Sequence, residues 1–148
     1  MTTRFRLLPC TEDGFPRDAG LELPEFVRQA CEQNARWYAQ AGYRPPWHGY
    51  VALAEGAAVG GGGFKEPPKD GRVEIAYFTA PACEGRGHAT RTARELIAIA
   101  RRTDPTLAIA AQTLPAENAS TAILRKLGFR LDGPRADPET GTVWEWRL

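Results

Sequence analysis

The turn between residues 80 and 90 has the composition of a phosphate-binding site. Gly85 and Gly87 allow the backbone to turn tightly and to approach a ligand closely. A helix is predicted to begin near Gly87, and the first N–H groups of a helix have no intrahelical acceptor. The aligned peptide dipoles add partial positive charge at the same end. The sequence therefore predicts an anion cradle that binds a diphosphate with little help from charged side chains.

A strand and a helix must position this turn. Residues 72–79 form a short apolar run of strand-favouring side chains that ends before Pro81. After the turn, apolar residues recur on one face of a predicted helix that extends to about Arg102, and charged residues lie largely on the other face. This pattern indicates a helix that packs on a sheet.

The remaining segments predict further strands and two more helices. Strands are expected at residues 4–8, 49–55, 57–65, 106–113, 129–132 and 142–148. A long helix is expected at residues 24–41, and a short helix after Pro115 that Asn118 or Ser120 could cap. The long helix is expected to bury one stripe, which comprises Phe26, Val27, Ala30, Cys31, Trp37, Tyr38 and Ala41. The short helix is expected to bury Ala119, Ala122, Ile123 and Leu127.

Glycine and proline residues mark two special segments. The glycine run at residues 60–63 is interpreted as strand, because no Gly-Lys-Ser/Thr ending follows it and no helix begins there. Glycines inside a strand often mark a close approach of neighbouring backbone. Residues 133–141 are expected to form a loop. The order of elements predicts an α+β fold with a mixed sheet, in a single domain over residues 1–148.

Five ring-bearing side chains have alternative interpretations. Trp37 and Tyr38 could line a substrate pocket, but aromatic residues at helical spacing favour a core position. Trp144 and Trp146 share one face of the last strand and are also expected in the core. His88 lies in the first turn of the helix after the cradle, where we expect exposure to solvent.

Composition limits the class of protein and of partner. A formal net charge of +1 gives no electrostatic reason to expect nucleic acid or an anionic membrane as the main partner. Cys10, Cys31 and Cys83 lie far apart without a CxxC pair, so no metal site is expected. The first ten residues lack the apolar region of a signal peptide, and no segment is apolar enough to span a bilayer. We therefore expect a cytoplasmic protein.

A dinucleotide-binding domain of the Rossmann type also has a glycine turn between a strand and a helix. Here GRGHAT lacks the third glycine of GxGxxG, an antiparallel hairpin is predicted before the turn, and no regular alternation of strand and helix follows. This class remains an alternative to the one favoured below.

Two segments resemble the motifs of the GCN5-related N-acetyltransferases (GNAT), in particular the ribosomal-protein-acetyltransferase-like branch. EIAYFTAPACEGRGHAT is similar to the family's acetyl-coenzyme A motif, where Gly87 and Ala89 match the pattern and Glu84 departs from it. PAENASTAILRKLGF resembles the later motif, an Asn/Ser-bearing helix before a Lys-x-Gly-Phe strand entry. The resemblance covers nearly the whole chain. It implies a GNAT-like three-layer fold, with helices on both sides of a mostly antiparallel sheet of about six to seven strands.

The same resemblance implies an acetyl-coenzyme A dependent N-acetyltransferase that moves the acetyl group from the thioester to a primary amine by direct attack. The strand that carries Glu74 is expected to splay from the strand at 106–113 and admit the pantetheine arm. A backbone N–H near residues 76–78 could stabilise the oxyanion. The expected cofactor-binding residues are Ala76, Tyr77, Phe78, Glu84, Gly85, Arg86, Gly87, His88, Ala89, Thr90, Asn118 and Ser120.

Glu74 is the candidate catalytic residue. An amine arrives protonated and needs a base, and this carboxylate matches a position that the family often uses for that purpose. It could equally be a surface or salt-bridged strand residue. Leu124 stands where many relatives have the tyrosine that protonates the leaving thiolate. Tyr77, His88 and Ser120 are candidate substitutes, although a thiol pKa of about 8.5 makes a dedicated acid dispensable.

Replacement of that tyrosine keeps a second hypothesis open, a non-catalytic module that binds or senses acyl-coenzyme A. For the enzyme, the acceptor is expected to be a small-molecule amine or a protein amino terminus. Its selection is expected to depend on residues 10–47 and 133–141. The sequence is also compatible with a homodimer.

Overall fold

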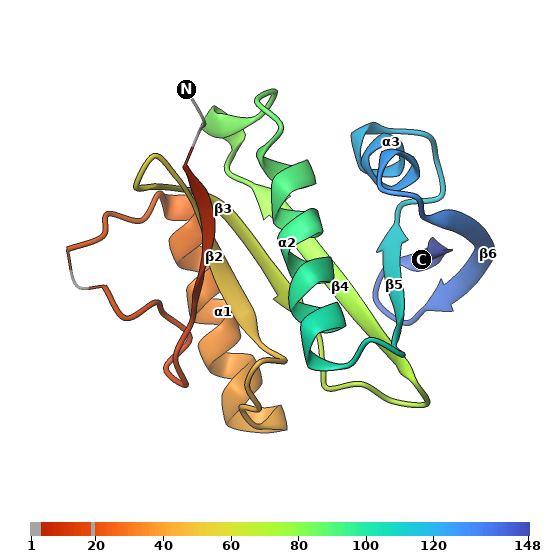
Figure 1. Ribbon diagram of the computed structural model, residues 1–148, viewed down its shortest axis with the longest axis horizontal. Helices are drawn as coiled ribbons and strands as arrows, with labels where there is room; N and C mark the ends of the chain where they lie inside the picture. Colours follow the sequence, from red (N-terminus) through yellow and green to blue (C-terminus); the bar gives the residue numbers. More distant parts are fainter. Residues whose placement is uncertain (1–3, 19) are drawn as a thin grey trace.

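The computed structural model describes residues 4–18 and 20–148 and contains a seven-stranded sheet with helices on both faces. The elements in chain order are β1 (Phe5–Pro9), α1 (Glu25–Ala41), β2 (Gly49–Ala54), β3 (Ala57–Phe64), β4 (Arg72–Thr79), the 3₁₀ turn η1 (Pro81–Cys83), α2 (His88–Thr103), β5 (Ala108–Thr113), α3 (Ala119–Lys126), β6 (Arg130–Asp137) and β7 (Gly141–Arg147) (Figure 1). The strand order in the sheet is β1-β2-β3-β4-β5-β7-β6. The predicted order of elements is thus confirmed.

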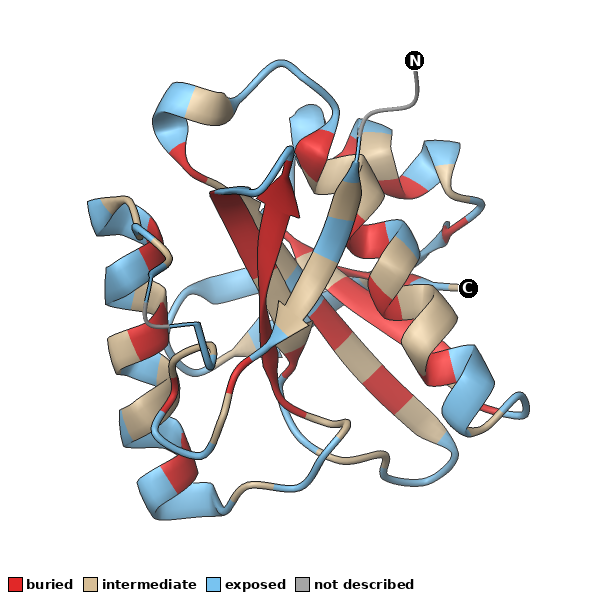
Figure 2. Cartoon of the chain, turned by 60° about the vertical axis from the view of Figure 1, so that its left-hand side comes forward, coloured by how far each residue is buried: buried red, intermediate tan, exposed pale blue. Residues whose placement is uncertain are grey.

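The sheet is antiparallel except where β4 pairs with β5. That arrangement excludes the doubly wound parallel sheet of a Rossmann domain. Figure 2 shows α1 and α2 on opposite sides of the sheet. The molecule therefore has the three-layer α+β architecture that the sequence predicts.

The last hairpin differs from the prediction. Residues 133–141 were expected to form a loop, but β6 continues to Asp137 and pairs with β7 over its whole length, with an irregularity between Leu131 and Gly133. Pro134 is compatible with a strand here because β6 is the edge of the sheet, where one side of the backbone has no strand partner. Only residues 138–140 remain as a turn, so the hairpin is longer than expected.

The main core lies between the sheet and the two later helices. Its largest fully buried side chains are Trp146, Ile75, Leu96, Ile109 and Leu124. Trp144 packs edge-on against Trp146 with ring centroids 6.4 Å apart, which confirms that the two rings share one strand face. Trp146 is in the core as expected, whereas Trp144 is only partly buried.

The glycine run forms the second half of β3, as predicted. A methyl group added at Gly60 would lie 2.3 Å from the carbonyl oxygen of Phe78, and one at Gly62 would lie 2.5 Å from that of Ala76. Gly61 and Gly63 are limited in the same way by the carbonyl oxygens of β2 and the residue before it. The expected close approach of backbone is therefore confirmed, and no side chain fits along this part of the strand.

The three cysteines are free thiols, and Cys10 and Cys31 lie in the smaller core beneath α1. Among the described residues, no helix has the length and apolar character needed to cross a membrane. The cytoplasmic location stays a prediction.

Candidate functional site

The sheet opens between its two central strands. β4 pairs with β5 only over residues 72–75, which face residues 108–111. Beyond Ile75, β4 continues to Thr79 with β3 as its described partner, while Gln112 and Thr113 of β5 pair with β7. Figure 1 shows the two strands diverging towards the end of the molecule where α2 begins. Backbone groups on one side of residues 76–79 therefore face the gap.

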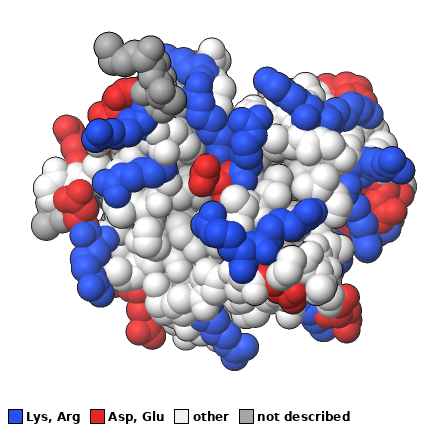
Figure 3. Space-filling model, viewed as in Figure 1, with Lys and Arg blue, Asp and Glu red and all other residues white. Residues whose placement is uncertain are grey.

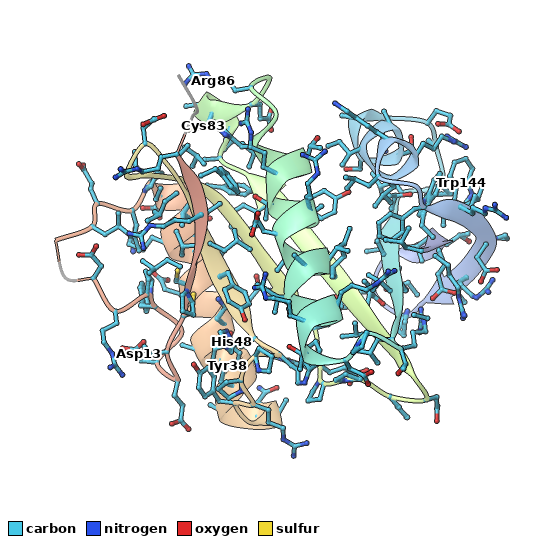
Figure 4. The ribbon with its side chains drawn as sticks, in the orientation of Figure 1. Asp13, Tyr38, His48, Cys83, Arg86 and Trp144 are labelled. Atoms are coloured by element: carbon cyan, nitrogen blue, oxygen red, sulfur yellow. The ribbon has the colours of Figure 1, made fainter. Side chains whose placement is uncertain are left out.

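The predicted anion cradle lies at this open end. η1 directly follows β4, and Gly85 and Gly87 both adopt a positive φ of 80° before α2 begins. The first intrahelical bond is donated by the N–H of Arg91 to the carbonyl of Gly87. The N–H groups of the three preceding helical residues consequently have no acceptor within the helix. Figure 4 places Cys83 and Arg86 at this end of the molecule.

Arginine side chains support the cradle. Arg91 Nη1 donates to the carbonyl oxygen of Arg86 at 3.2 Å, which ties the turn to the first helical turn. Figure 3 shows further Lys and Arg side chains over the outer face of α2. The positive charge of these side chains adds to that of the helix start, so the site suits an anionic ligand.

His88 is not solvent-exposed as predicted, since only 7% of its surface is accessible. At the first helical position its ring turns back over β1 and stacks on Phe5, with centroids 6.2 Å apart and an interplanar angle of 11°. Burial and the nearby charges of Arg91 and Arg86 lower its pKa. The backbone N–H of His88 can reach an anion in the cradle, whereas its side chain belongs to the packing under α2.

Because of its two histidines, we expect the folding stability of the protein to fall at acidic pH. Burial lowers the pKa of His88 and of His48, which stacks on Tyr50 and donates its Nδ1–H to Gly49 O at 2.8 Å. Between the lowered folded pKa and the unfolded value near 6.5, the unfolded chain binds more protons. The stability is therefore complete above about pH 6.5 and is lost as the pH falls below it. Urea unfolding should give a smaller difference in unfolding free energy between pH 7 and pH 5 for His88→Gln than for the parent chain, and an unchanged difference would contradict this.

Glu74 lies on the face of β4 that is turned towards α1, because it alternates with Val73 and Ile75, which face α2. Its carboxylate Oε2 lies 2.5 Å from Lys65 Nζ, and its side chain is 16% exposed. The salt-bridged state that the sequence left open is therefore present. The same carboxylate also lies two residues from the point where β4 and β5 separate.

A cavity of about 820 Å³ lies between α1, the sheet and the turn at residues 138–140. Its floor is formed by Gly62 and Gly63 of the glycine run and by residues 76–78 of β4, and one wall by α1. The residues that face it from the other elements include Asn34, Trp37, Tyr38, Lys65, Asp137 and Glu139. The cavity thus meets the strand segment at which the sheet opens, from the face opposite α2.

The buried stripe predicted for α1 is only half correct. Val27, Cys31 and Tyr38 are buried, but Phe26 and Trp37 are 46% and 47% exposed. The two exposed aromatics are eleven residues apart and so lie on one face of the helix, where the Phe26 ring contacts Phe78 of β4 at a centroid distance of 5.6 Å. Trp37 borders the cavity and donates its Nε1–H to Lys65 O at 3.0 Å. Trp37 is therefore outside the core position that the spacing favoured, and its role in a substrate pocket stays a prediction.

The acidic turn of the β6–β7 hairpin lies within residues 133–141, the segment on which acceptor selection was expected to depend, but no single residue of it was predicted. Asp137 Oδ1 accepts hydrogen bonds from the backbone N–H groups of Glu139 and Thr140 at 2.8 and 3.1 Å. These bonds hold the pKa of Asp137 below its usual value, with a smaller contribution from the charge of Lys65. The sequence placed these residues in an undefined loop, so nothing there indicated that the carboxylates would face α1.

Asn118 begins α3 in a structural role. Its Oδ1 accepts a hydrogen bond from the N–H of Thr121 at 3.0 Å, and its own N–H donates to Thr121 Oγ1 at 2.9 Å. Asn118 is therefore the cap, and Ser120 lies exposed in the first turn. The predicted buried face is wrong in part, because Ala119 and Ala122 are exposed while Thr121 and Leu124 are buried.

Among the expected proton donors, only Tyr77 has a titrating side chain directed to the α2 face near the gap. Burial raises the pKa of its hydroxyl to about 12, so it is protonated at neutral pH. Leu124 is fully buried in the core and has no group that can donate a proton. Glu74, residues 76–78 and the cradle thus follow one another along β4 to the start of α2, and α3 supplies no tyrosine at position 124.

Comparisons with known proteins agree with this geometry. A family model described as an acetyltransferase (GNAT) domain matches residues 15–130. No curated protein sequence matches the chain significantly.

Solved structures share the fold at low sequence identity. A putative acetyltransferase from Acinetobacter baylyi is 21% identical, with a TM-score of 0.71 over 100% of this chain and 94% of that one. RimL, a ribosomal-protein α-N-acetyltransferase, is 16% identical, with a TM-score of 0.69 and the same coverage of both chains. A putative acetyltransferase from Salmonella typhimurium, solved with acetyl-CoA, is 23% identical, with a TM-score of 0.60 over 80% of this chain and 72% of that one.

The matched lengths differ among these structures. The alignments cover 64% of an acetyltransferase from Bacillus anthracis and 66% of an N-acetyltransferase from Staphylococcus aureus. The family model covers more than half of the chain. The opening between β4 and β5 and the glycine turn before α2 are consistent with that family. The chain belongs to the GNAT acetyltransferase family.

Proposed function

We propose that this protein is an acetyl-CoA-dependent N-acetyltransferase that transfers the acetyl group directly to a primary amine. One observation carries the proposal: the sheet opens beside residues 76–79 of β4, the cradle follows at that open end before α2, and the acceptor-sized cavity meets residues 76–78 from the α1 side. A donor held on the α2 side and an amine held on the α1 side would meet there. A covalent enzyme intermediate is then unnecessary, because the two reactants are in reach of each other.

The residues around the gap fit coenzyme A. The diphosphate would bind the backbone N–H groups of Glu84, Gly85, Arg86, Gly87, His88, Ala89 and Thr90, with help from the arginines of α2. The pantetheine arm would lie in the gap against Ala76, Tyr77 and Phe78 on one side and Asn118 and Ser120 on the other. Acetyl-CoA supplies an activated acyl group when bound.

Glu74 would act as the base in this reaction. Its carboxylate can take a proton from an incoming ammonium, directly or through a water molecule. A backbone N–H of residues 76–78 would stabilise the oxyanion, an interaction worth about 2.7–4 kcal/mol in other acyl-transfer sites. Since a thiol has a pKa of about 8.5, the thiolate can leave without a dedicated acid.

Gly87→Ala tests the cradle. A left-handed backbone costs an alanine about 1–2 kcal/mol, so the variant should be less stable and should bind coenzyme A more weakly, by several-fold or more, as measured by calorimetry. Gly71→Ala is a matched control, since Gly71 has a φ of 72° and nothing within 4 Å of the added methyl. The control should lose similar stability and keep its affinity. Equal affinity in the two variants would contradict the assignment of the cradle.

The acceptor is proposed to be a small-molecule amine or a protein amino terminus bound in the cavity beside α1. The exposed ring of Trp37 offers an apolar contact, and Asp137 and Glu139 favour a cation. A panel of amines and amino-terminal peptides, assayed by thiol release from acetyl-CoA, tests the function. Thiol release above the acceptor-free rate with at least one amine supports the proposed function. If no amine raises the rate, the proposed function is rejected.

A non-catalytic acyl-CoA binding module is the second candidate. Two observations favour it. The buried Leu124 stands where relatives have a tyrosine that acts as the acid, and the carboxylate of Glu74, the candidate base, is paired with Lys65. It predicts tight binding of coenzyme A without thiol release. Binding calorimetry beside the amine panel separates the two candidates.

A further inference from the structure

Lys65 holds an unusual place among the amines of the chain. The sequence has three lysines, Lys65, Lys69 and Lys126, whereas most of its nineteen basic residues are arginines. All three lysines are exposed residues, but Lys65 alone faces the large cavity and is paired with the candidate base. In the described part of the chain, neither Lys69 nor Lys126 forms an ion pair.

The backbone of Lys65 is fixed while its side chain is not. Its carbonyl oxygen accepts the Trp37 Nε1–H at 3.0 Å, and its N–H donates to the carbonyl of Glu74 at 3.4 Å. Its side chain is 51% exposed and has four rotatable methylenes. The ammonium can therefore move within the cavity around a fixed point.

The Lys65 ammonium lies close to the Glu74 carboxylate without a well-directed hydrogen bond. Glu74 Oε2 is enclosed and makes no well-directed hydrogen bond in the described structure, although Lys65 Nζ lies 2.5 Å away. An ion pair with one half-exposed partner is weakly held, so it does not lock the amine in place. The carboxylate is nonetheless positioned to take a proton from this nitrogen.

The reaction centre proposed above is within reach of the same amine. Lys65 and residues 76–78 line one cavity. Residue 76 follows Glu74 by two positions, which is about 7 Å along a strand. A lysine side chain spans a comparable length, so Nζ can move within the cavity from the carboxylate towards residue 76, the first residue of β4 that is not paired with β5.

We infer that Lys65 is an internal acetyl acceptor, and that the protein acetylates its own Nζ when acetyl-CoA is bound and no external amine is present. This inference rests on the acetyltransferase activity proposed above. In the step, the Lys65 ammonium gives a proton to Glu74 and the neutral nitrogen attacks the carbonyl carbon of the acetyl-CoA thioester. The N–C bond forms, the C–S bond breaks, the second N–H proton passes to solvent, and the thiolate leaves to be protonated by water.

Acetylation would also change the acceptor site. The acetylated side chain is neutral and cannot pair with Glu74, so the carboxylate becomes available to an external ammonium. The modification would thus convert a self-occupied site into an open one.

The test incubates the intact protein with acetyl-CoA alone and locates acetyl groups by peptide mass spectrometry. Acetylation of Lys65 that far exceeds that of Lys69 and Lys126, with a rate constant independent of protein concentration, is expected. Equal acetylation of all three lysines would show unselective chemistry and overturn the inference. The same sample unfolded in guanidinium gives the unselective pattern for comparison.

Variants and a parallel assay complete the test. Lys65→Arg keeps the charge and should show no incorporation at position 65, while Glu74→Gln should lose most incorporation at Lys65 and retain coenzyme A binding. The amine panel is run on the same preparation. Thiol release with an external amine but no acetyl group on Lys65 overturns this inference and leaves the proposed function intact, whereas no release under any condition overturns both.

Discussion

Glu74→Gln is expected to lower kcat/KM for an external amine by about 10²- to 10⁴-fold, the usual contribution of a general base. The substitution keeps the shape of the side chain but removes its capacity to accept a proton at neutral pH. Coenzyme A affinity should not change, because Glu74 lies on the α1 face while the cradle lies at the start of α2. Thiol release at several acceptor concentrations separates the effect on kcat from that on KM.

Glu66→Gln is the matched control. Glu66 lies one residue beyond Lys65 and is exposed, so the same chemical change is made beside the site without altering the carboxylate in question. It should retain nearly full activity. A loss for Glu74→Gln no greater than that for Glu66→Gln would show that Glu74 is a structural ion-pair residue.

Trp146→Ala is expected to destabilise the protein by about 3–5 kcal/mol, the range found when a buried aromatic is truncated. The ring is fully buried, its Nε1–H donates to Thr113 Oγ1 at 3.0 Å, and the guanidinium of Arg125 lies 4.9 Å from its centroid. The variant loses packing between β5, β7 and α3 at once. Tm should fall by roughly 6–20 °C, given a shift of about 2–4 °C for each kcal/mol.

Trp144→Ala provides the comparison for Trp146→Ala, because both rings stand on the same face of β7 but Trp144 is only partly buried. Its Tm should fall by much less. Similar losses in calorimetric scans of the two variants would mean that the ring of Trp146 is not the centre of this core.

The elements could be predicted because local patterns decide them. The glycine turn, Pro81 and the apolar repeat of the following helix fix the ends of β4 and the start of α2 within one or two residues. The glycine run required a close backbone approach whichever strand lay beside it. In each case the decisive interaction is with residues near in sequence or with backbone alone.

The errors concern side chains whose surroundings come from distant parts of the chain. From the sequence alone, His88 is expected at an exposed helical position. It is covered because Phe5 of β1, which is distant in the sequence, stacks on its ring. Trp37 follows the same helical spacing as buried residues, yet α1 is rotated so that this side faces the cavity. The strand that became β6 was predicted too short because proline usually ends a strand. Pro134 is accepted within β6 because this strand lies at the edge of the sheet.

The candidate site was predicted unevenly for the same reason. Residues of the cradle lie in one continuous segment, so their grouping is visible in the sequence. Lys65 and Asp137 come from separate hairpins, and no local pattern places Lys65 beside Glu74 or Asp137 at the cavity. Their part in the site depends on the pairing of β3 with β4 and on the length of the last hairpin.

The glycine run of β3 also limits how the acceptor preference of the proposed acetyltransferase can be redesigned. Any side chain at residues 60–63 would collide with neighbouring carbonyl groups, so libraries that randomise the floor of the cavity would yield mainly misfolded members. The exposed face of α1 and the turn at residues 138–140 carry no such restriction. Directed evolution towards new amines should therefore diversify these walls and leave the glycine strand unchanged.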